Sequence, residues 1–359
     1  MSTWKDHVLR VTPYVPGEQP QGTDIIKLNT NENPYPPSPG VQEVMRTLDA
    51  EELRRYPDPD ASRLIQALAH RYKVPADQIF AGVGSDDVLA LAFLTFFSRE
   101  YAGAGQTESR LIFPDVTYSF YRVWAALYGI PCEEVPLGQD FTLWDAGAVP
   151  SGVRGIVIAN PNAPTGIAAP LTQIEEIVRC NPQCVVIVDE AYIDFGGESA
   201  LPLIGRYDNL LVVQTFSKSR SMAGMRIGYA FGNKELISAL KAVKFSVNSY
   251  TLNLPSILAG EAALQDEAYF QETVDRIKAT RERTSSSLND IGFTTLTSAA
   301  NFLFTRPPGN HAREIYEHLR VRGIYVRYFD APRTRDYLRI TVGTDNEINR
   351  LIEVLKTLI

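Results

Sequence analysis

The feature that most constrains the fold is an alternation, through the middle of the chain, of short apolar runs with segments of helical spacing. Gly155–Ala159, Val185–Val188 and Leu210–Thr215 are such runs, and they carry almost no charge. Continuous apolar runs of this length are typical of parallel strands buried on both faces. The sequence therefore predicts an α/β layer structure. The other expected strands are Ile79–Val83, Arg110–Phe113 and Ile227–Phe231, and the expected helices are Ser85–Phe97, Ser119–Tyr128 and Thr172–Arg179.

The last part of the chain has a different pattern. After Asn233 the helical segments become long, with Glu267–Leu288 the longest, and a smaller α+β unit follows. Its expected strands are Asn301–Phe304, Ile324–Val326 and Tyr337–Val342, and its expected helices are Ala312–Val321 and Asn346–Leu358. Residues 11–40 are rich in Pro, Gly, Asn and Thr, which predicts an extended arm. We expect an arm with part of the small domain at residues 1–45, a large domain at 46–270 and a small C-terminal domain at 271–359.

Charge and hydropathy exclude several classes of protein. Lys and Arg number 35 and Asp and Glu 42, a net charge of −7, so no basic surface for nucleic acid is expected. Val88–Phe97 is the longest strongly apolar run, about half of the ~20 residues that a membrane helix needs. Residues 1–10 lack the apolar stretch of a secretory signal, which predicts a cytoplasmic protein. The three cysteines lack Cys-x-x-Cys spacing, so neither a disulfide framework nor a metal site is expected.

A glycine-rich loop joins the first expected strand to the helix that follows it. Gly82-Val83-Gly84-Ser85-Asp86-Asp87 puts free backbone N–H groups and the positive end of a helix dipole at one point, where a phosphate can bind. The same residues also suit a tight turn capped by Ser85 or Asp86. The Gly-Lys-[Ser/Thr] ending of a nucleoside-triphosphate loop is missing, and so is the third glycine of a dinucleotide fingerprint, at Asp87.

Two further strand ends carry polar residues. Asn160-Pro161-Asn162-Ala163-Pro164-Thr165-Gly166 predicts a rigid loop at the end of a buried strand, where ligands of open α/β sheets collect. The next strand ends in Asp189, with Tyr192 three residues on. A carboxylate there has either a cationic partner or a shifted pKa, although a helix cap is an equal alternative.

A lysine among small hydroxyl residues follows the next apolar strand. Lys218 is flanked by Ser217 and Ser219, and Arg226 comes eight residues later. An amine beside an anion site suits a Schiff base with a phosphorylated cofactor, whereas a lone loop lysine is usually only solvated.

Together these motifs resemble the fold-type I aminotransferases that use pyridoxal phosphate, and within that family the branch that acts on histidinol phosphate. The resemblance runs from Tyr14 to Gly343 and implies a large domain with a mostly parallel sheet flanked by helices, plus a smaller α+β domain. Its markers are Leu28–Pro34 (LNTNENP), Arg55–Asp58 (RYPD), Gly82–Asp86 (GVGSD), Asn160–Gly166, Asp189–Tyr192 (DEAY), Ser217-Lys218 with Arg226, and Leu338–Gly343 (LRITVG).

By this resemblance Lys218 holds the cofactor covalently and then acts as the general base. Asp189 pairs with the pyridine nitrogen, Tyr192 hydrogen-bonds the ring's 3-oxygen, and Tyr118 stacks on the ring, although an aromatic residue at a helix start is more often core.

The same resemblance implies a phosphate site and a homodimer. Gly84, Ser85 and Asp86 supply the loop, with Ser217 and Arg226 beside it. Tyr56 reaches the phosphate from the other subunit, so the active sites are shared.

The sequence departs from the family at Ala163. The family usually has asparagine directly before Pro-Thr-Gly, with its side chain on the 3-oxygen, and a methyl group cannot donate that bond. Asn162 is the neighbouring substitute, or Tyr192 acts alone.

For the substrate, Arg339 matches the arginine that holds an α-carboxylate, a task for a guanidinium fork. Arg327 matches a second arginine of the histidinol-phosphate branch. Tyr14 and Asn33 of the arm are expected to cover the substrate. Each arginine could instead form a surface salt bridge.

The resemblance thus implies transamination between histidinol phosphate or imidazole-acetol phosphate and glutamate or 2-oxoglutarate, a step of histidine biosynthesis. An aromatic or broad-range aminotransferase and a threonine-phosphate decarboxylase share the motifs. A non-catalytic regulator that senses pyridoxal phosphate is disfavoured, because no segment offers a DNA-binding unit.

Overall fold

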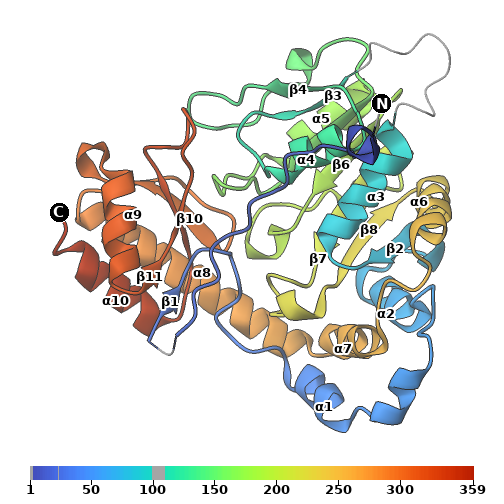
Figure 1. Cartoon of the computed structure of the whole chain (residues 1–359), viewed down its shortest axis with the longest axis horizontal. Coiled ribbons are helices and arrows are strands. Elements are labelled where there is room, and N and C mark those ends of the chain that lie inside the picture. The colour runs from blue at the N-terminus through green and yellow to red at the C-terminus, as the bar shows by residue number, and fades with distance from the viewer. Residues whose placement is uncertain (1–2, 23, 99–109) are drawn as a thin grey trace.

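The computed structural model describes residues 3–22, 24–98 and 110–359. A larger body contains a seven-stranded sheet, and a smaller body near the C-terminus contains a four-stranded sheet (Figure 1). The strands of the large sheet are β2 (Ile79–Gly82), β3 (Leu111–Pro114), β4 (Cys132–Val135), β5 (Gly155–Ala159), β6 (Val185–Asp189), β7 (Leu210–Thr215) and β8 (Gly228–Gly232). Their order is β2-β8-β7-β6-β5-β3-β4.

The large sheet is parallel except at β8, which runs antiparallel to both of its neighbours, β2 and β7. Its central strands are apolar throughout because both faces are buried. Val186 and Val188 belong to the core on one face, and Ile187 belongs to the core on the other. The alternation seen in the sequence therefore reflects a sheet between two helical layers.

The helices are α1 (Pro39–Thr47), α2 (Ser62–Tyr72), α3 (Ser85–Phe97), α4 (Phe120–Leu127), α5 (Leu171–Cys180), α6 (Lys234–Val247), α7 (Leu254–Gln265), α8 (Glu267–Asp290), α9 (Ala312–Val321) and α10 (Asp345–Leu355). The core on one face of the large sheet includes residues of α3, α4 and α6, and the other core includes residues of α2, α5 and α7. Both faces are thus covered.

The smaller body follows α8, a 24-residue helix that crosses from one body to the other (Figure 1). Its sheet is antiparallel, in the order β12 (Arg327–Tyr328), β13 (Leu338–Thr341), β10 (Phe302–Arg306) and β9 (Thr294–Thr295). A separate two-stranded sheet pairs β1 (Ile26–Lys27) in parallel with β11 (Ile324–Tyr325). Residues from both ends of the sequence therefore build this body.

The expected fold class, α/β with a mostly parallel sheet and a smaller α+β unit, is confirmed. The expected strand Ile324–Val326 is observed as β11, which ends at Tyr325. Beyond the buried Val326 the chain enters β12, which belongs to a different sheet. The proposed boundary between residues 270 and 271 falls inside α8 and stays a prediction. No helix among the described residues is long and apolar enough to cross a membrane.

Candidate active site

A cavity of about 210 Å³ lies at the carboxyl ends of β5, β6 and β7 and extends to β12 and β13 of the small body. Most of the residues singled out in the sequence line it. They are Tyr14, Ser85, Asp86, Tyr118, Asp189, Tyr192, Ser217, Lys218, Arg226, Arg327 and Arg339. Gly84, Asn33, Asn162 and Tyr56 are not among its lining residues.

Asp189 ends β6 and is almost fully buried. Burial raises the pKa of its carboxyl to about 6, against the effect of hydrogen bonds that favour the charged form. The Tyr121 hydroxyl donates one of them at 2.7 Å, and the Ala191 N–H donates another at 3.2 Å. The buried carboxylate is thus held in place by these hydrogen bonds and lines the cavity.

Lys218 lies on the loop after β7 and lines the cavity. Lys218 Nζ donates to the carbonyl oxygen of Thr30 at 3.3 Å. The Asn33 side chain holds the backbone of this loop, because its Nδ2 donates to the carbonyl oxygens of Lys218 and Ser219, each at 3.1 Å. Asn33 therefore fixes the lysine's backbone and does not line the cavity.

The N-terminus of α3 faces the same cavity. The loop before it adopts a glycine conformation at Gly84, with φ +86°. The start of β8 packs directly on this loop, since a Cβ at Gly228 would lie 2.2 Å from Ser85 N. Ser85, Ser217 and Arg226 bring donors to the helix N-terminus, an arrangement that binds anions.

The walls beside the helix N-terminus are aromatic. The Tyr118 hydroxyl donates to Asp86 Oδ1 at 2.9 Å, and Arg226 Nη2 lies 3.5 Å from Asp86 Oδ2. Burial, followed by the charge of Asp86, raises the pKa of Tyr118 well above its ordinary value. Tyr14 of the arm stacks on Phe120 at 4.2 Å between ring centres and closes this side.

The loop after β5 contributes an apolar surface. Ala163 packs with Ala300 and Phe302, and Tyr192 packs against this cluster. The amide of Asn162 points elsewhere, because its Nδ2 donates to the Val116 carbonyl oxygen at 2.9 Å and to Thr165 Oγ1 at 3.0 Å. The residue next to Ala163 therefore offers no donor to the cavity.

Two arginines of the small body point into the cavity. Arg339 Nη2 donates to the Asn29 carbonyl oxygen at 2.9 Å, while its buried Nε has no partner among the described residues. Burial lowers the pKa of Arg339. Arg327 Nη2 donates to the Val15 carbonyl oxygen at 3.3 Å. Both cations therefore keep donors that an anionic ligand could accept.

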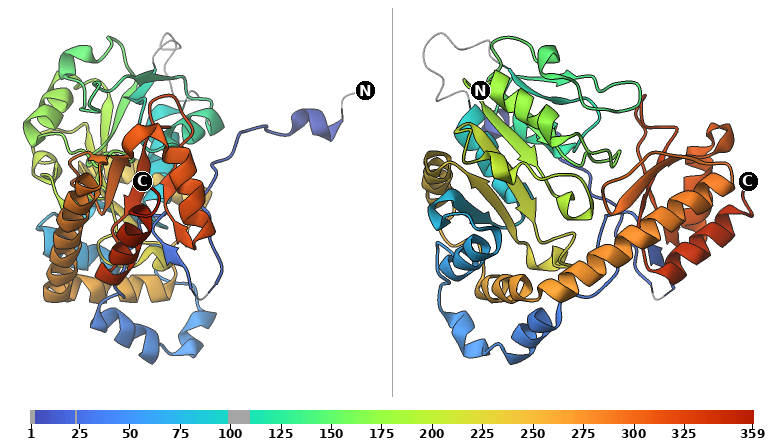
Figure 2. Two further views of the ribbon diagram at one scale, coloured as in Figure 1. Left: turned by 90° about the vertical axis from the view of Figure 1, so that its left-hand side faces the viewer. Right: turned by 180° about the vertical axis from the view of Figure 1, so that it is seen from behind.

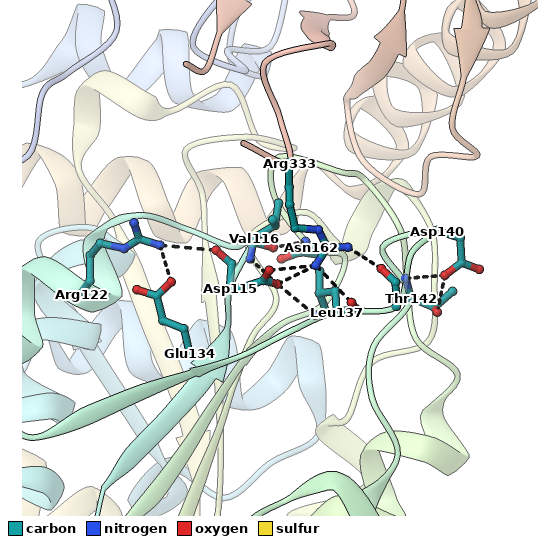
Figure 3. A network of polar contacts seen from close by, with 10 residues as sticks. Asp115, Val116, Arg122, Glu134, Leu137, Asp140, Thr142, Asn162 and Arg333 are labelled. Carbon is teal, nitrogen blue, oxygen red and sulfur yellow. Dashed lines mark hydrogen bonds and ion pairs between the residues drawn. The ribbon is translucent and has the colours of Figure 1, made fainter. Parts of the chain in front are cut away.

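A second cavity of about 380 Å³ adjoins the first and shares Tyr14, Tyr118, Ala163, Arg327 and Arg339 with it. Arg333 crosses its rim from the small body to the large one (Figure 3). Arg333 Nη1 donates to Asp115 Oδ2 at 2.8 Å and to the Leu137 carbonyl oxygen at 3.1 Å. Arg122 pairs with Glu134 on the same rim at 3.0 Å.

Tyr56 lies on the outer surface, where the residue is 81% exposed. Its ring stacks on Tyr250 at 4.5 Å. In the single chain, Tyr56 is thus not brought together with the other residues of the site.

Sequence reasoning missed Asn31 and Tyr121. Asn31 lines the cavity, and its Nδ2 donates to the Tyr192 hydroxyl at 2.9 Å. Tyr121 lies three residues after Tyr118, so helical spacing was the available signal for it. Asn31 lies inside the LNTNENP motif, but no local pattern predicts its partner.

Comparisons with known proteins agree with this geometry. A family model described as aminotransferase class I and II matches residues 23–355. A histidinol-phosphate aminotransferase of Aromatoleum aromaticum is 51% identical over 359 residues, covering 99% of each chain. One from a Marinomonas species is 50% identical over 357 residues, with the same coverage.

Among solved structures, the histidinol-phosphate aminotransferase of Sinorhizobium meliloti in complex with pyridoxal-5'-phosphate is 26% identical, with a TM-score of 0.82. The match covers 93% of this chain and 92% of that one. Because the family match spans most of the chain, and a lysine, a buried carboxylate and an anion-binding helix end meet in one cavity, the chain belongs to the class I and II aminotransferase family.

Proposed function

We propose that this chain transfers an amino group between histidinol phosphate and 2-oxoglutarate, forming imidazole-acetol phosphate and glutamate, with pyridoxal phosphate as its cofactor. The observation that carries the proposal is one cavity lined by Lys218, Asp189 and two arginines. The names of the relatives from Aromatoleum aromaticum and Marinomonas support the choice of substrate.

The donors and acceptors of the cavity fit the cofactor. The N-terminus of α3, with Ser85, Ser217 and Arg226, suits its phosphate. Asp189 suits the protonated ring nitrogen, because a buried carboxylate stabilises a nearby positive charge. When bound, pyridoxal phosphate supplies an aldehyde for the amino group and a ring that accepts electrons.

The chain's own residues then bind, orient and move a proton. Lys218 Nζ takes the proton from the amino-bearing carbon of the substrate as general base. Tyr192 would donate to the 3-oxygen of the bound ring, and Tyr118 would stack on the ring face. We assign no such role to Asn162, because its amide already donates to Val116 and Thr165.

The two arginines suit substrates with different anions. Histidinol phosphate carries a phosphate where glutamate carries an α-carboxylate, and a phosphate can accept from two guanidinium forks at once. We assign Arg339 to both substrates and Arg327 chiefly to the phosphate. Tyr14 covers the substrate from the arm.

We further propose a homodimer with shared active sites, working in the cytoplasm. The N-terminal segment projects from the body (Figure 2), and its apolar side chains are exposed, Trp4 at 72% and Val15 at 74%. Exposed apolar side chains of this kind suit a partner surface. Tyr56 would complete the phosphate site of the other subunit.

The test compares amino donors on purified holoenzyme. Histidinol phosphate should exceed phenylalanine and tyrosine in kcat/KM. Arg327→Ala should lower kcat/KM for histidinol phosphate by about thirtyfold or more, since loss of one fork from a partly buried dianion costs on the order of 2 to 5 kcal/mol. The glutamate half-reaction should change much less, whereas Arg339→Ala should impair both half-reactions.

Arg327→Lys is the matched control, because it keeps the charge and removes the planar fork. It should recover only part of the loss. Equal losses for both substrates in Arg327→Ala, or a wild type that prefers phenylalanine, would favour an aromatic aminotransferase. Release of carbon dioxide from threonine phosphate would favour the decarboxylase.

A further inference from the structure

Asn31 lies in a strained conformation at the edge of the cavity. Its φ is +57° and the residue is 1% exposed. Residues other than glycine rarely adopt this left-handed conformation, and asparagine does so most readily. Such strain persists only where the surroundings hold the residue firmly.

Two residues of the small body hold Asn31 in place. Asn31 N donates to Thr341 Oγ1 at 3.0 Å, and Asn301 Nδ2 donates to the Asn31 carbonyl oxygen at 2.9 Å. Thr341 Oγ1 in turn donates to Asn31 Oδ1 at 3.0 Å. Both the backbone and the side chain of Asn31 are therefore fixed by groups that are themselves buried.

These bonds determine which way the Asn31 amide faces. Thr341 Oγ1 already accepts from Asn31 N, so its own hydrogen is available for Asn31 Oδ1. In the reverse amide orientation that buried hydrogen would lose the acceptor it has in the structure, and an unsatisfied buried donor is costly. Asn31 Nδ2 therefore faces Tyr192 and donates to its hydroxyl oxygen at 2.9 Å.

The direction of that bond has a consequence for Tyr192. Because the Tyr192 oxygen accepts from Asn31, the hydroxyl hydrogen remains available to donate into the cavity. The ring also packs against apolar residues, among them Phe302, edge-on at 5.0 Å, and Ala163 on one side and the cluster containing Phe195 and Val342 on the other. Lys218 Nζ lies 5.9 Å from the ring centre, and Tyr118, Tyr121 and Arg339 are the other titratable groups that interact with Tyr192 electrostatically.

We propose that Asn31 is a positioning residue that turns the Tyr192 hydroxyl to donate to the bound cofactor. This role compensates for Ala163, where the methyl group offers no donor. The inference rests on the proposed function only in that it takes the 3-oxygen of pyridoxal phosphate as the acceptor. It links the arm and the small body to the electronic state of the cofactor.

The test is a pH titration of the visible absorbance of the holoenzyme, without substrate. Asn31→Asp keeps the size and tolerates the left-handed backbone, but it replaces the donor by an acceptor, so Tyr192 would donate to residue 31. The ring oxygen then loses a donor and retains a neighbouring proton more tightly. We expect the midpoint of the titration to rise by about one pH unit.

The same change in a Tyr192→Phe background separates this effect from the added charge. There, Asn31→Asp should shift the midpoint by much less, because no hydroxyl remains to be turned. Asn31→Gly removes the side-chain amide and relieves the left-handed backbone. We expect it to raise the titration midpoint by less than Asn31→Asp does, and this rise should also vanish in the Tyr192→Phe background. Should Asn31→Asp not fold, Asn31→Gly carries the comparison.

Equal shifts in the two backgrounds, or no shift in either, would overturn the role of Asn31. A wrong substrate assignment would leave this titration unchanged and would appear only in the donor comparison. A wild type without a visible cofactor band would overturn both proposals.

Discussion

Asp189 and Tyr121 form the buried contact that a single substitution probes most directly. Burial raises the pKa of Asp189 to about 6, and the Tyr121 hydroxyl opposes that shift. Tyr121→Phe should raise the pKa further, so at pH 6 a larger share of Asp189 is protonated in the variant than in the wild type. We expect the variant apoprotein to bind pyridoxal phosphate about tenfold more weakly than the wild type at pH 6, since a hydrogen bond to a charged group contributes about 1.5–3 kcal/mol.

The loss should be smaller at pH 8, where Asp189 is largely ionised in both proteins. Equilibrium titration with the cofactor at the two pH values measures it. Tyr229→Phe is the control, because Tyr229 is equally buried but its hydroxyl donates to Gln214. A loss that is the same at both pH values would contradict the role of Tyr121.

At the residue scale, the sequence predicts side chains that follow apolar strands and misses those that act through distant segments. Asp189, Lys218 and Arg226 lie at strand or loop positions that a pattern can reveal, and all three line the cavity. Asn31 contacts Tyr192 across 161 residues and Thr341 across 310. No local periodicity carries information about such pairs.

At the scale of elements, the segment between β12 and β13 is fastened to the large body by Arg333 (Figure 3). Arg333→Ala should free this segment, because the partly buried Asp115 and the Leu137 carbonyl lose their donor. We expect faster hydrogen exchange and proteolysis at residues 331–337, with a cost of about 1 to 3 kcal/mol in local stability.

Arg313→Ala is the matched control near the same segment. Arg313 pairs with Asp330 on the exposed surface, where an ion pair contributes little. Exchange at residues 331–337 should stay close to wild type in this variant. Similar acceleration in both variants would mean that Arg333 does not fasten the segment.

Elements were predictable where burial is symmetric and less so where a strand lies at an edge. β5, β6 and β7 are apolar on both faces, so continuous runs revealed them. β4 is an edge strand with alternating exposure, and the residues Cys132–Val135 gave no apolar run. The split between β11 and β12 depends on pairing with β1, far away in the sequence.

At the scale of the whole molecule, the proposed shared active sites predict complementation between two inactive partners. Lys218→Ala removes the amine of a subunit's own site, and Tyr56→Ala removes the residue given to the other subunit. A hybrid dimer would hold one site with both residues and one with neither. Random mixing by co-refolding should restore about a quarter of wild-type activity, as expected for a symmetric dimer.

Activity is measured before and after mixing, and sedimentation checks that a dimer is present. Mixing Lys218→Ala with Arg226→Ala is the control, because both residues would belong to the same subunit's site. This mixture should restore no activity, because every site in it lacks either Lys218 or Arg226. No recovery in the Tyr56 mixture would place Tyr56 outside the active site.

The pairing of β1 with β11 also determines when this part of the chain can fold during synthesis. Ile26 finds Ile324 only after about 300 further residues have been made, which takes roughly 15 to 60 s at ~5–20 residues per second. During that interval the large sheet can already form on the ribosome, whereas β1 in the arm has no strand to pair with until β11 is made. Asn31 reaches Thr341 later still, so the pocket around Tyr192 is among the last parts of the newborn chain to close.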